Sequence, residues 1–203
     1  DAGNIGSASD TDAVAISSGG VATFSQNTVG AGGMDFLYAV TSSSAVSSHD
    51  ISSTYINSTY DNYFLVGYFE GDGDTKYLEC QVFVGGSIQT GSIYGYGSAN
   101  IDGAAYQNAN SEVDLFTATA SGMGGDDGEG THINVVFQNA NNTQAPFCAS
   151  GFSNFHDVDA AHSGTVFGGS LKPANRANVV NGLRLKMHSG NTTYAKFKLY
   201  GLR

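Results

Sequence analysis

The chain has no tryptophan, two cysteines, two prolines and only 8 lysine and arginine residues among 203. It also has no apolar run of about 18 residues, which argues against a membrane-spanning helix. The formal net charge is −10, and an acidic chain repels phosphate groups, which disfavours nucleic acid as a partner. We therefore expect neither membrane insertion nor nucleic-acid binding.

Two cysteines cannot form a disulfide framework, but a chain of 203 residues can bury a core without one. Cys80 alternates with Leu78, Val82 and Val84, so we expect these four side chains to be buried on the apolar face of a strand. The sequence favours two buried free thiols, Cys80 and Cys148. A single disulfide between them is the alternative.

The abundant residues point to β-structure. Glycine (28 residues), serine, threonine, asparagine and tyrosine are frequent, and no window repeats apolar residues at the helical period over three turns. Short alternating segments recur instead, separated by turns rich in glycine and asparagine. The chain is therefore predicted to be all-β, with an antiparallel β-sandwich or jelly roll over residues 34–203. The expected strands lie near residues 35–40, 63–69, 76–84, 88–96, 112–119, 132–139, 146–152, 165–171, 179–188 and 194–202.

Residues 1–33 differ from the rest of the chain. The stretch "DAVAISSGGVATFSQ" predicts a hairpin, and "TVGAGG" at residues 28–33 is typical of a flexible linker. An isolated hairpin is marginally stable in water. We expect this N-terminal arm to be ordered by contacts with other copies of the chain, most simply in a homotrimer.

The last two predicted strands, Val179–His188 and Tyr194–Leu202, are separated by a short turn and are expected to pair antiparallel. Alternation divides their side chains between a buried and an exposed face. The inward side chains would be Leu183, Leu185, Phe197 and Leu199. The outward side chains would be the cations Arg184, Lys186, Lys196 and Lys198.

Four neighbouring cations repel one another, so an anionic partner is expected for them. All 18 acidic residues lie at or before Asp159, whereas every basic residue except Lys76 lies at or after Lys172. The partner could be the acidic part of another copy of the chain. Within the chain it could be Glu112 and Asp114 in "EVDLF", both expected to point outward.

Three segments carry several potential metal ligands. None has the spacing of an EF-hand loop or of a common zinc site, and exposed turns are the simpler interpretation. We expect no metal and no cofactor. The segments are "GDGDT" with Asp72 and Asp74, "GGDDGEG" with Asp126, Asp127 and Glu129, and "FHDVDAAH" with His156, Asp157, Asp159 and His162.

No catalytic motif is evident in the sequence. There is no GxSxG nucleophile motif, and neither cysteine lies in an electropositive setting. No carboxylate lies in an apolar, aromatic context that would prepare it for glycoside cleavage, so we expect a protein that is not an enzyme. Tyr60, Tyr94 and Tyr96 lie in tyrosine-rich stretches that could contact a receptor; packing at the rim of the sandwich is the alternative.

Four segments occur in a recognisable order. They are "DISSTYINSTYDNYFLVGYF" (50–69), "VFVGGSIQTGSIYGYG" (82–97), "GGSLKPANRANVVNGLRLKMHSGN" (168–191) and "FKLYGLR" (197–203). This order resembles C-terminal β-sandwich domains in virion structural proteins of tailed bacteriophages, many of them aquatic. The resemblance involves no catalytic residue and implies a structural or adhesive role.

The resemblance implies a virion protein exposed on the particle surface, as a tail fibre, an appendage or a host-receptor-binding domain. Its partners would be copies of itself, other virion proteins and, in the last role, a host-surface receptor or glycan. A head-decoration (cement) protein that stabilises the capsid shell is the first alternative. A secreted carbohydrate-binding module is the alternative from another class.

Overall fold

The computed structural model of the protein divides into two compact units, residues 1–35 and residues 36–203. Among the residues that the structure describes, the secondary structure consists of β-strands and one short 3-10 helix at Pro173–Asn175. The predicted all-β class is therefore confirmed. No helix among the described residues is long and apolar enough to span a membrane. The structure describes residues 3–7, 10–20, 22–24, 33–101, 103, 106–119 and 121–203.

The first unit contains a three-stranded antiparallel sheet in the order β1-β2-β3. β2 (Asp10–Ile16) and β3 (Ala22–Phe24) form the expected hairpin, with Gly20 in the left-handed region at φ 78°. β1 (Gly3–Ser7) adds a strand that the sequence pattern did not predict. The predicted linker falls mostly outside the described residues.

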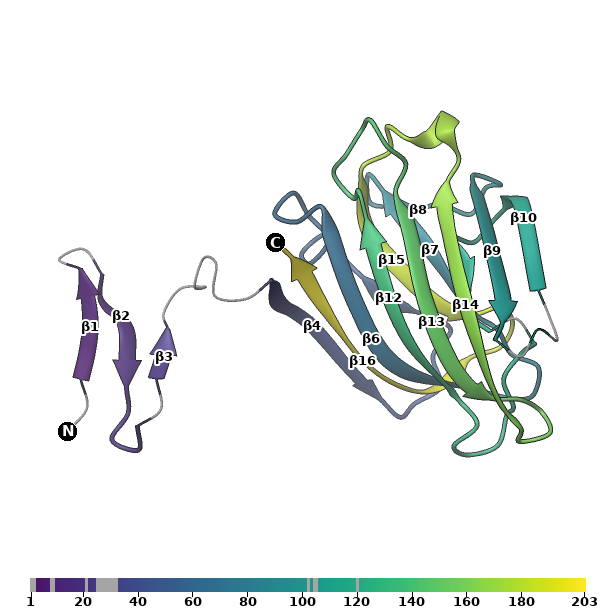
Figure 1. Ribbon diagram of the computed structural model, residues 1–203, viewed down its shortest axis with the longest axis horizontal. Helices are drawn as coiled ribbons and strands as arrows, with labels where there is room; N and C mark the ends of the chain where they lie inside the picture. Colours follow the sequence, from purple (N-terminus) through teal and green to yellow (C-terminus); the bar gives the residue numbers. More distant parts are fainter. Residues whose placement is uncertain are drawn as a thin grey trace. The chain divides into compact units, whose positions relative to one another are not determined.

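The second unit is an antiparallel β-sandwich of two sheets (Figure 1). The larger sheet has the order β10-β9-β14-β13-β12-β6-β16-β4, and the smaller has the order β11-β7-β15-β5 with β8 paired to β7. The larger sheet contains β4 (Met34–Ser42), β6 (Asn62–Gly71), β9 (Tyr94–Asn100), β10 (Tyr106–Glu112), β12 (Thr131–Gln138), β13 (Cys148–His156), β14 (His162–Leu171) and β16 (Thr192–Leu202). The smaller sheet contains β5 (His49–Ile51), β7 (Leu78–Val84), β8 (Ser87–Ile88), β11 (Phe116–Thr117) and β15 (Val180–Met187).

The core lies between the two sheets, where alternate residues of each strand point inward. Phe197 of β16 stacks on Phe69 of β6, with ring centroids 5.3 Å apart. Val84, predicted to be buried, is half-buried at the end of β7. The other predicted core residues are buried, namely Leu78, Cys80, Val82, Leu183, Leu185, Phe197 and Leu199.

Phe197 packs where its partner strand has no side chain. Gly67 of β6 lies opposite Phe197 in the strand register. A Cβ atom added to Gly67 would lie 2.9 Å from Phe197 Cα and 3.0 Å from the carbonyl oxygen of Lys196. Glycine is therefore required here for close packing of the backbone and the aromatic ring.

The predicted pairing of the last two strands is wrong. β15 pairs with β5 and β7 in the smaller sheet, whereas β16 lies between β6 and β4 in the larger sheet. The connection between them therefore crosses from one layer to the other. The Asp72 carboxylate anchors it by accepting a hydrogen bond from the Asn191 backbone N–H (2.7 Å). Both strands pack an apolar face into the same core. Their alternating pattern is therefore the same whether they form a hairpin or lie in different sheets.

Two other predicted strands differ from the structure, and two observed strands, β5 and β10, were not predicted. The expected strand at 88–96 is divided between β8 and β9, and the expected strand at 112–119 is largely loop apart from Glu112, which ends β10, and β11. The short strand β5 pairs with β15 at the edge of the smaller sheet and places His49 and Ile51 toward the core.

Candidate functional site

The outer face of the larger sheet carries the side chains that alternate with the core residues. No element in the described part of the second unit packs on this face, which is toward the viewer in Figure 1. The strand register aligns these side chains in rows across the sheet. One row contains Lys198, Val66, Asn134, Phe152 and Val166, and the next contains Lys196, Tyr68, His132, Asn154 and Gly164.

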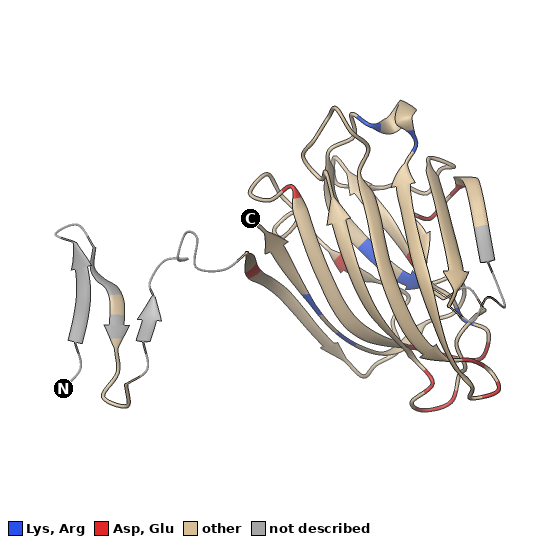
Figure 2. Cartoon of the chain, in the orientation of Figure 1, with Lys and Arg blue, Asp and Glu red and all other residues tan. Residues whose placement is uncertain are grey.

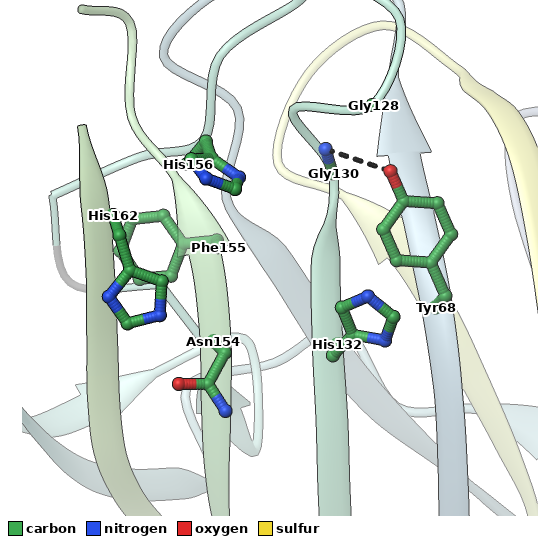
Figure 3. A pocket seen from close by; sticks show the side chains of 8 residues that line it. All are labelled: Tyr68, Gly128, Gly130, His132, Asn154, Phe155, His156 and His162. Atoms are coloured by element: carbon green, nitrogen blue, oxygen red, sulfur yellow. Dashed lines mark hydrogen bonds between the residues drawn. The ribbon is translucent and has the colours of Figure 1, made fainter. Parts of the chain in front are cut away.

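Two adjoining hollows lie on this face and share Tyr68 and His132 in their walls. The first, called the lysine hollow here, has a volume of about 450 Å³. The second, called the histidine hollow, has a volume of about 290 Å³ (Figure 3). The lysine hollow is also lined by Val66, Gly67, Ile133, Asn134, Tyr194, Lys196, Phe197 and Lys198. The histidine hollow is also lined by Gly128, Gly130, Asn154, Phe155, His156 and His162.

Tyr68 is held in place between the two hollows. Its hydroxyl donates a hydrogen bond to Glu70 Oε1 (2.7 Å) and accepts one from the Gly130 N–H (3.2 Å; Figure 3). Burial, together with the Glu70 carboxylate, raises the pKa of Tyr68, so the phenol stays protonated at neutral pH. Its ring centroid lies 4.5 Å from that of His132 and 6.0 Å from that of Tyr194. The hollows therefore have a fixed aromatic wall.

Gly130 makes this arrangement possible. A Cβ atom added there would collide first with the Phe69 carbonyl oxygen, and it would lie 2.7 Å from Glu70 Cγ and 2.8 Å from Tyr68 Cζ. Any larger residue at position 130 would therefore have to shift the β6 backbone as well as the hydrogen-bonded Tyr68 and Glu70 side chains. This single glycine therefore couples the loop before β12 to the shape of the face.

The charge on this face is positive at the lysine hollow. Lys196 and Lys198 are exposed on β16 and have no ion-pair or hydrogen-bond partner among the described residues. The five strands that line the hollows, β6, β12, β13, β14 and β16, contain one acidic residue, Glu70. Glu70 is already hydrogen-bonded to Tyr68 and to the Gly128 N–H.

Acidic residues gather instead in the loops at one end of the sandwich (Figure 2). Their carboxylates cap backbone turns. Asp74 accepts a hydrogen bond from the Gly125 N–H, and Glu129 accepts one from the Asp126 N–H. Asp157 accepts hydrogen bonds from two N–H groups of its own turn. Among the described residues, no group of three or more His, Cys, Asp or Glu side chains is close enough to hold a metal ion.

Two of the four cations predicted to contact a partner are neutralised within the chain. Arg184 makes two hydrogen bonds of 2.7 Å to Asp50, and Lys186 pairs with Glu79 and with Asp114. The prediction that Asp114 points outward is wrong, because its side chain is buried against Lys186. Four adjacent cations do not form a single face, because β15 and β16 belong to different sheets.

The predicted acidic counterpart Glu112 has no ion pair among the described residues and ends β10, opposite Tyr94 in the register. Lys196 and Lys198 keep the exposed positions that the sequence predicted. Of the six residues expected at a partner contact, these two lysines are the ones that the structure brings to a hollow.

The predicted receptor contacts Tyr94 and Tyr60 are wrong because both side chains are buried. The Tyr94 hydroxyl accepts a hydrogen bond from the Val82 N–H and donates one to the Gln89 carbonyl oxygen. Tyr60 packs against Tyr63. Tyr96 is half-buried and lines a separate shallow hollow on β9. The tyrosine-rich stretches that contain Tyr60 and Tyr94 therefore place these side chains in the core and not at a receptor contact.

Two tyrosines in the wall of the lysine hollow, Tyr68 and Tyr194, were not predicted from the sequence. Each stands at an outward position of a strand whose inward positions are apolar. An aromatic side chain at a polar position of an alternating strand is the signal that could have identified them.

Both cysteines are free, as the sequence favoured. Cys80 is buried, and burial raises the pKa of its thiol well above the usual value. Cys148 is half-exposed instead of buried, and partial burial raises the pKa of its thiol as well. Because the thiolate is the nucleophilic form, neither residue is prepared for covalent catalysis.

No protein-family model matches the chain, and a comparison with curated proteins finds no significant relative. Among solved structures, the crystal structure of exo-inulinase from Aspergillus awamori is similar with a TM-score of 0.37 and 9% sequence identity. The similarity covers 83% of this chain and 29% of that chain. A likeness at this level carries no functional argument, so function is inferred from the chain's own residues.

Proposed function

We propose that this chain is a non-enzymatic structural protein of a tailed bacteriophage particle, exposed as a tail fibre or appendage, whose second unit contacts the host surface. The observation that best supports attachment is the outer face of the larger sheet. This face combines two hollows, a fixed aromatic wall and two cations without partners on rigid strands. Binding sites built on such elements need little reorganisation when they take a ligand.

The chemistry of the hollows favours binding over catalysis. Most glycoside hydrolases cleave the glycosidic bond with two carboxyl groups that flank it. The strands that line the hollows supply one, Glu70, which is engaged by Tyr68 and Gly128. The remaining polar groups are imidazole, amide, phenol and ammonium groups, which recognise a ligand by hydrogen bonds and charge.

The first unit supports the assembly part of the proposal. Its three short strands form a small sheet of their own, and a sheet of this size has little surface to bury alone. Packing of three such sheets would give them a shared core. We therefore place the trimer contact in residues 1–35 and the host contact in residues 36–203.

A secreted carbohydrate-binding module is the second candidate. It is favoured by the same observation of Tyr68 and Tyr194 in the wall of an open hollow, because aromatic rings pack against the C–H faces of sugars. The two candidates differ in where the protein is found, on a phage particle or free in the medium.

Competition for adsorption tests the attachment role. Purified full-length chain is added to host cells before the phage particles that carry this protein, and unadsorbed particles are counted. We expect adsorption to fall as the chain concentration rises, whereas an unrelated acidic β-sandwich protein at the same concentration has no effect. Unchanged adsorption at saturating chain would overturn the host-contact proposal.

A further inference from the structure

We propose that the lysine hollow binds an anionic saccharide, a sugar that carries a carboxylate or sulfate group. The inference deepens the proposed attachment function, on which it rests, by naming the chemical class of the receptor. It places the acidic group of the sugar between Lys196 and Lys198 and the sugar ring against Tyr68 and Tyr194.

The first argument is the state of the two lysines. In a chain with 18 acidic residues and 8 basic ones, carboxylates for pairing are plentiful. Arg184, Lys186 and Lys76 each pair with at least one of them. Lys196 and Lys198 have no such partner among the described residues, although they stand two positions apart on the same face of β16. Their charge is available to an external anion.

The second argument is the neutral lining around the lysines. The lysine hollow contains no carboxylate among its lining residues, so an acidic ligand meets no like charge inside it. The Tyr68 and Tyr194 rings give it an apolar wall with hydroxyl groups, and Asn134 offers an amide that both donates and accepts hydrogen bonds. Rings, hydroxyls and amides match the C–H faces and hydroxyl groups of a sugar.

The adjoining histidine hollow extends the site toward a second sugar residue. Tyr68 and His132 form walls of both hollows, so a chain of sugars can pass from one to the other. Gly128, His156 and His162 of this second hollow lie next to the acidic turns that contain Asp126, Asp127 and Asp157. These turns disfavour another anionic group there, which indicates an uncharged residue next to the charged one.

A second copy of this acidic chain is the competing occupant of the lysine hollow. Its carboxylates could pair with Lys196 and Lys198, but the aromatic wall and the concave shape of the hollow suit a sugar ring better than a flat protein surface. If the lysine hollow binds a saccharide, charge reversal at the two lysines leaves assembly unchanged. If the hollow binds a second copy, charge reversal disrupts assembly. The experiment therefore measures saccharide binding and oligomeric state together.

Binding of the full-length chain is measured by biolayer interferometry against immobilised polygalacturonate, dextran sulfate and unmodified dextran. We expect one or both anionic polymers to bind, dextran to bind at least about tenfold more weakly, and the affinity to fall with added salt. Polygalacturonate and dextran sulfate distinguish a carboxylated from a sulfated sugar. Equal binding of dextran, or no binding of either anionic polymer, would overturn the inference.

The residue test uses Lys196→Glu/Lys198→Glu and, as a control of equal charge change at a distant site, Arg176→Glu/Lys172→Glu. The first variant should weaken anionic binding by about tenfold or more, and the control should not. Tyr194→Ala should also weaken anionic binding, without altering the net charge, and it tests the site if the double charge reversal fails to fold.

Sedimentation of Lys196→Glu/Lys198→Glu should match that of the wild type. A changed oligomeric state with unchanged saccharide binding would show that the two lysines contact a second copy of the chain instead of a sugar.

The outcomes also separate this inference from the attachment proposal. If the chain blocks phage adsorption but binds no anionic polymer, attachment stands and the ligand class is wrong. If it binds an anionic polymer through Lys196 and Lys198 but does not block adsorption, the site is real and the attachment role is wrong.

Discussion

Lys186 Nζ lies 3.3 Å from Asp114 Oδ1 and also pairs with Glu79, its direct neighbour across β15 and β7. One lysine thus contacts two carboxylates that are largely buried. Burial raises the pKa of Glu79, which the hydrogen bond from Lys186 opposes. Burial also works to lower the pKa of Lys186, but the two carboxylates outweigh it and leave that pKa raised. The cluster ties the loop before β11 to the outer side of the smaller sheet.

Removal of Lys186 should destabilise the fold more than removal of its neighbour Arg184. Lys186→Met leaves Glu79 and Asp114 unpaired near each other and should lower the free energy of unfolding by about 2–4 kcal/mol. Arg184→Met is the matched control on the same strand, because the Arg184–Asp50 pair is more exposed; its cost should be below about 1 kcal/mol. Urea denaturation of both variants gives the comparison, and equal costs would show that the cluster is solvated like an ordinary surface pair.

Gly67→Ala should also destabilise the protein. The new Cβ would collide with the Phe197 backbone and side chain, and overpacking of this kind costs about 1–3 kcal/mol. Gly91→Ala serves as the control, because its nearest neighbour would be the Ile93 side chain at 3.9 Å. Thermal unfolding of the two variants should show a lowered Tm for Gly67→Ala alone. An unchanged Tm would show that β6 and β16 can move apart to accommodate the added methyl group without loss of stability.

His49 makes stability depend on pH. Burial lowers the pKa of His49 below its ordinary value of 6.5, and its ring packs against Phe69 and Phe197. The unfolded chain takes up a proton near pH 6.5 that the folded protein resists, so stability falls as the pH drops below about 7. His49→Leu should lessen this fall by at most about 1.4 kcal/mol per pH unit. Denaturation at pH 7.5 and pH 5.5 measures it, and an identical fall in variant and wild type would contradict the assignment.

Deletion of residues 1–35 should leave the sandwich folded and abolish assembly. The core of the second unit is built entirely from residues after this segment, whereas the proposed trimer contact lies within it. Sedimentation velocity should show a trimer for the full chain and a monomer for residues 36–203. A trimer of the shortened chain would move the assembly contact to the sandwich.

Alternation in the sequence predicted the class of the fold and most of the core. Leu78, Cys80 and Val82 are buried as expected, because a residue's position in an alternating strand determines its face. The pairing of strands was harder to predict from the sequence. The strands with Leu185 and Phe197 obey the same pattern whether they form a hairpin or lie in different sheets, and only long-range contacts such as Asp72 with Asn191 decide between these arrangements.

The candidate site was predicted only in part. Lys196 and Lys198 were predicted as outward cations because they alternate with Phe197 and Leu199. Tyr68 and His132 escaped notice because their significance depends on the register that aligns β6 with β12, which is not encoded in either segment alone. The receptor contact predicted at Tyr94 was wrong because a buried phenol can form its hydrogen bonds with backbone groups, as the Tyr94 hydroxyl does.

The most direct test of the central claim is the position of this chain in an intact phage particle, determined by electron cryomicroscopy. The proposal predicts copies related by threefold symmetry in a tail fibre or appendage, with residues 1–35 at the contacts between copies and the lysine and histidine hollows open to solvent. Copies bound over the head shell with these hollows pressed against the capsid would contradict it, as would particles that lack the chain.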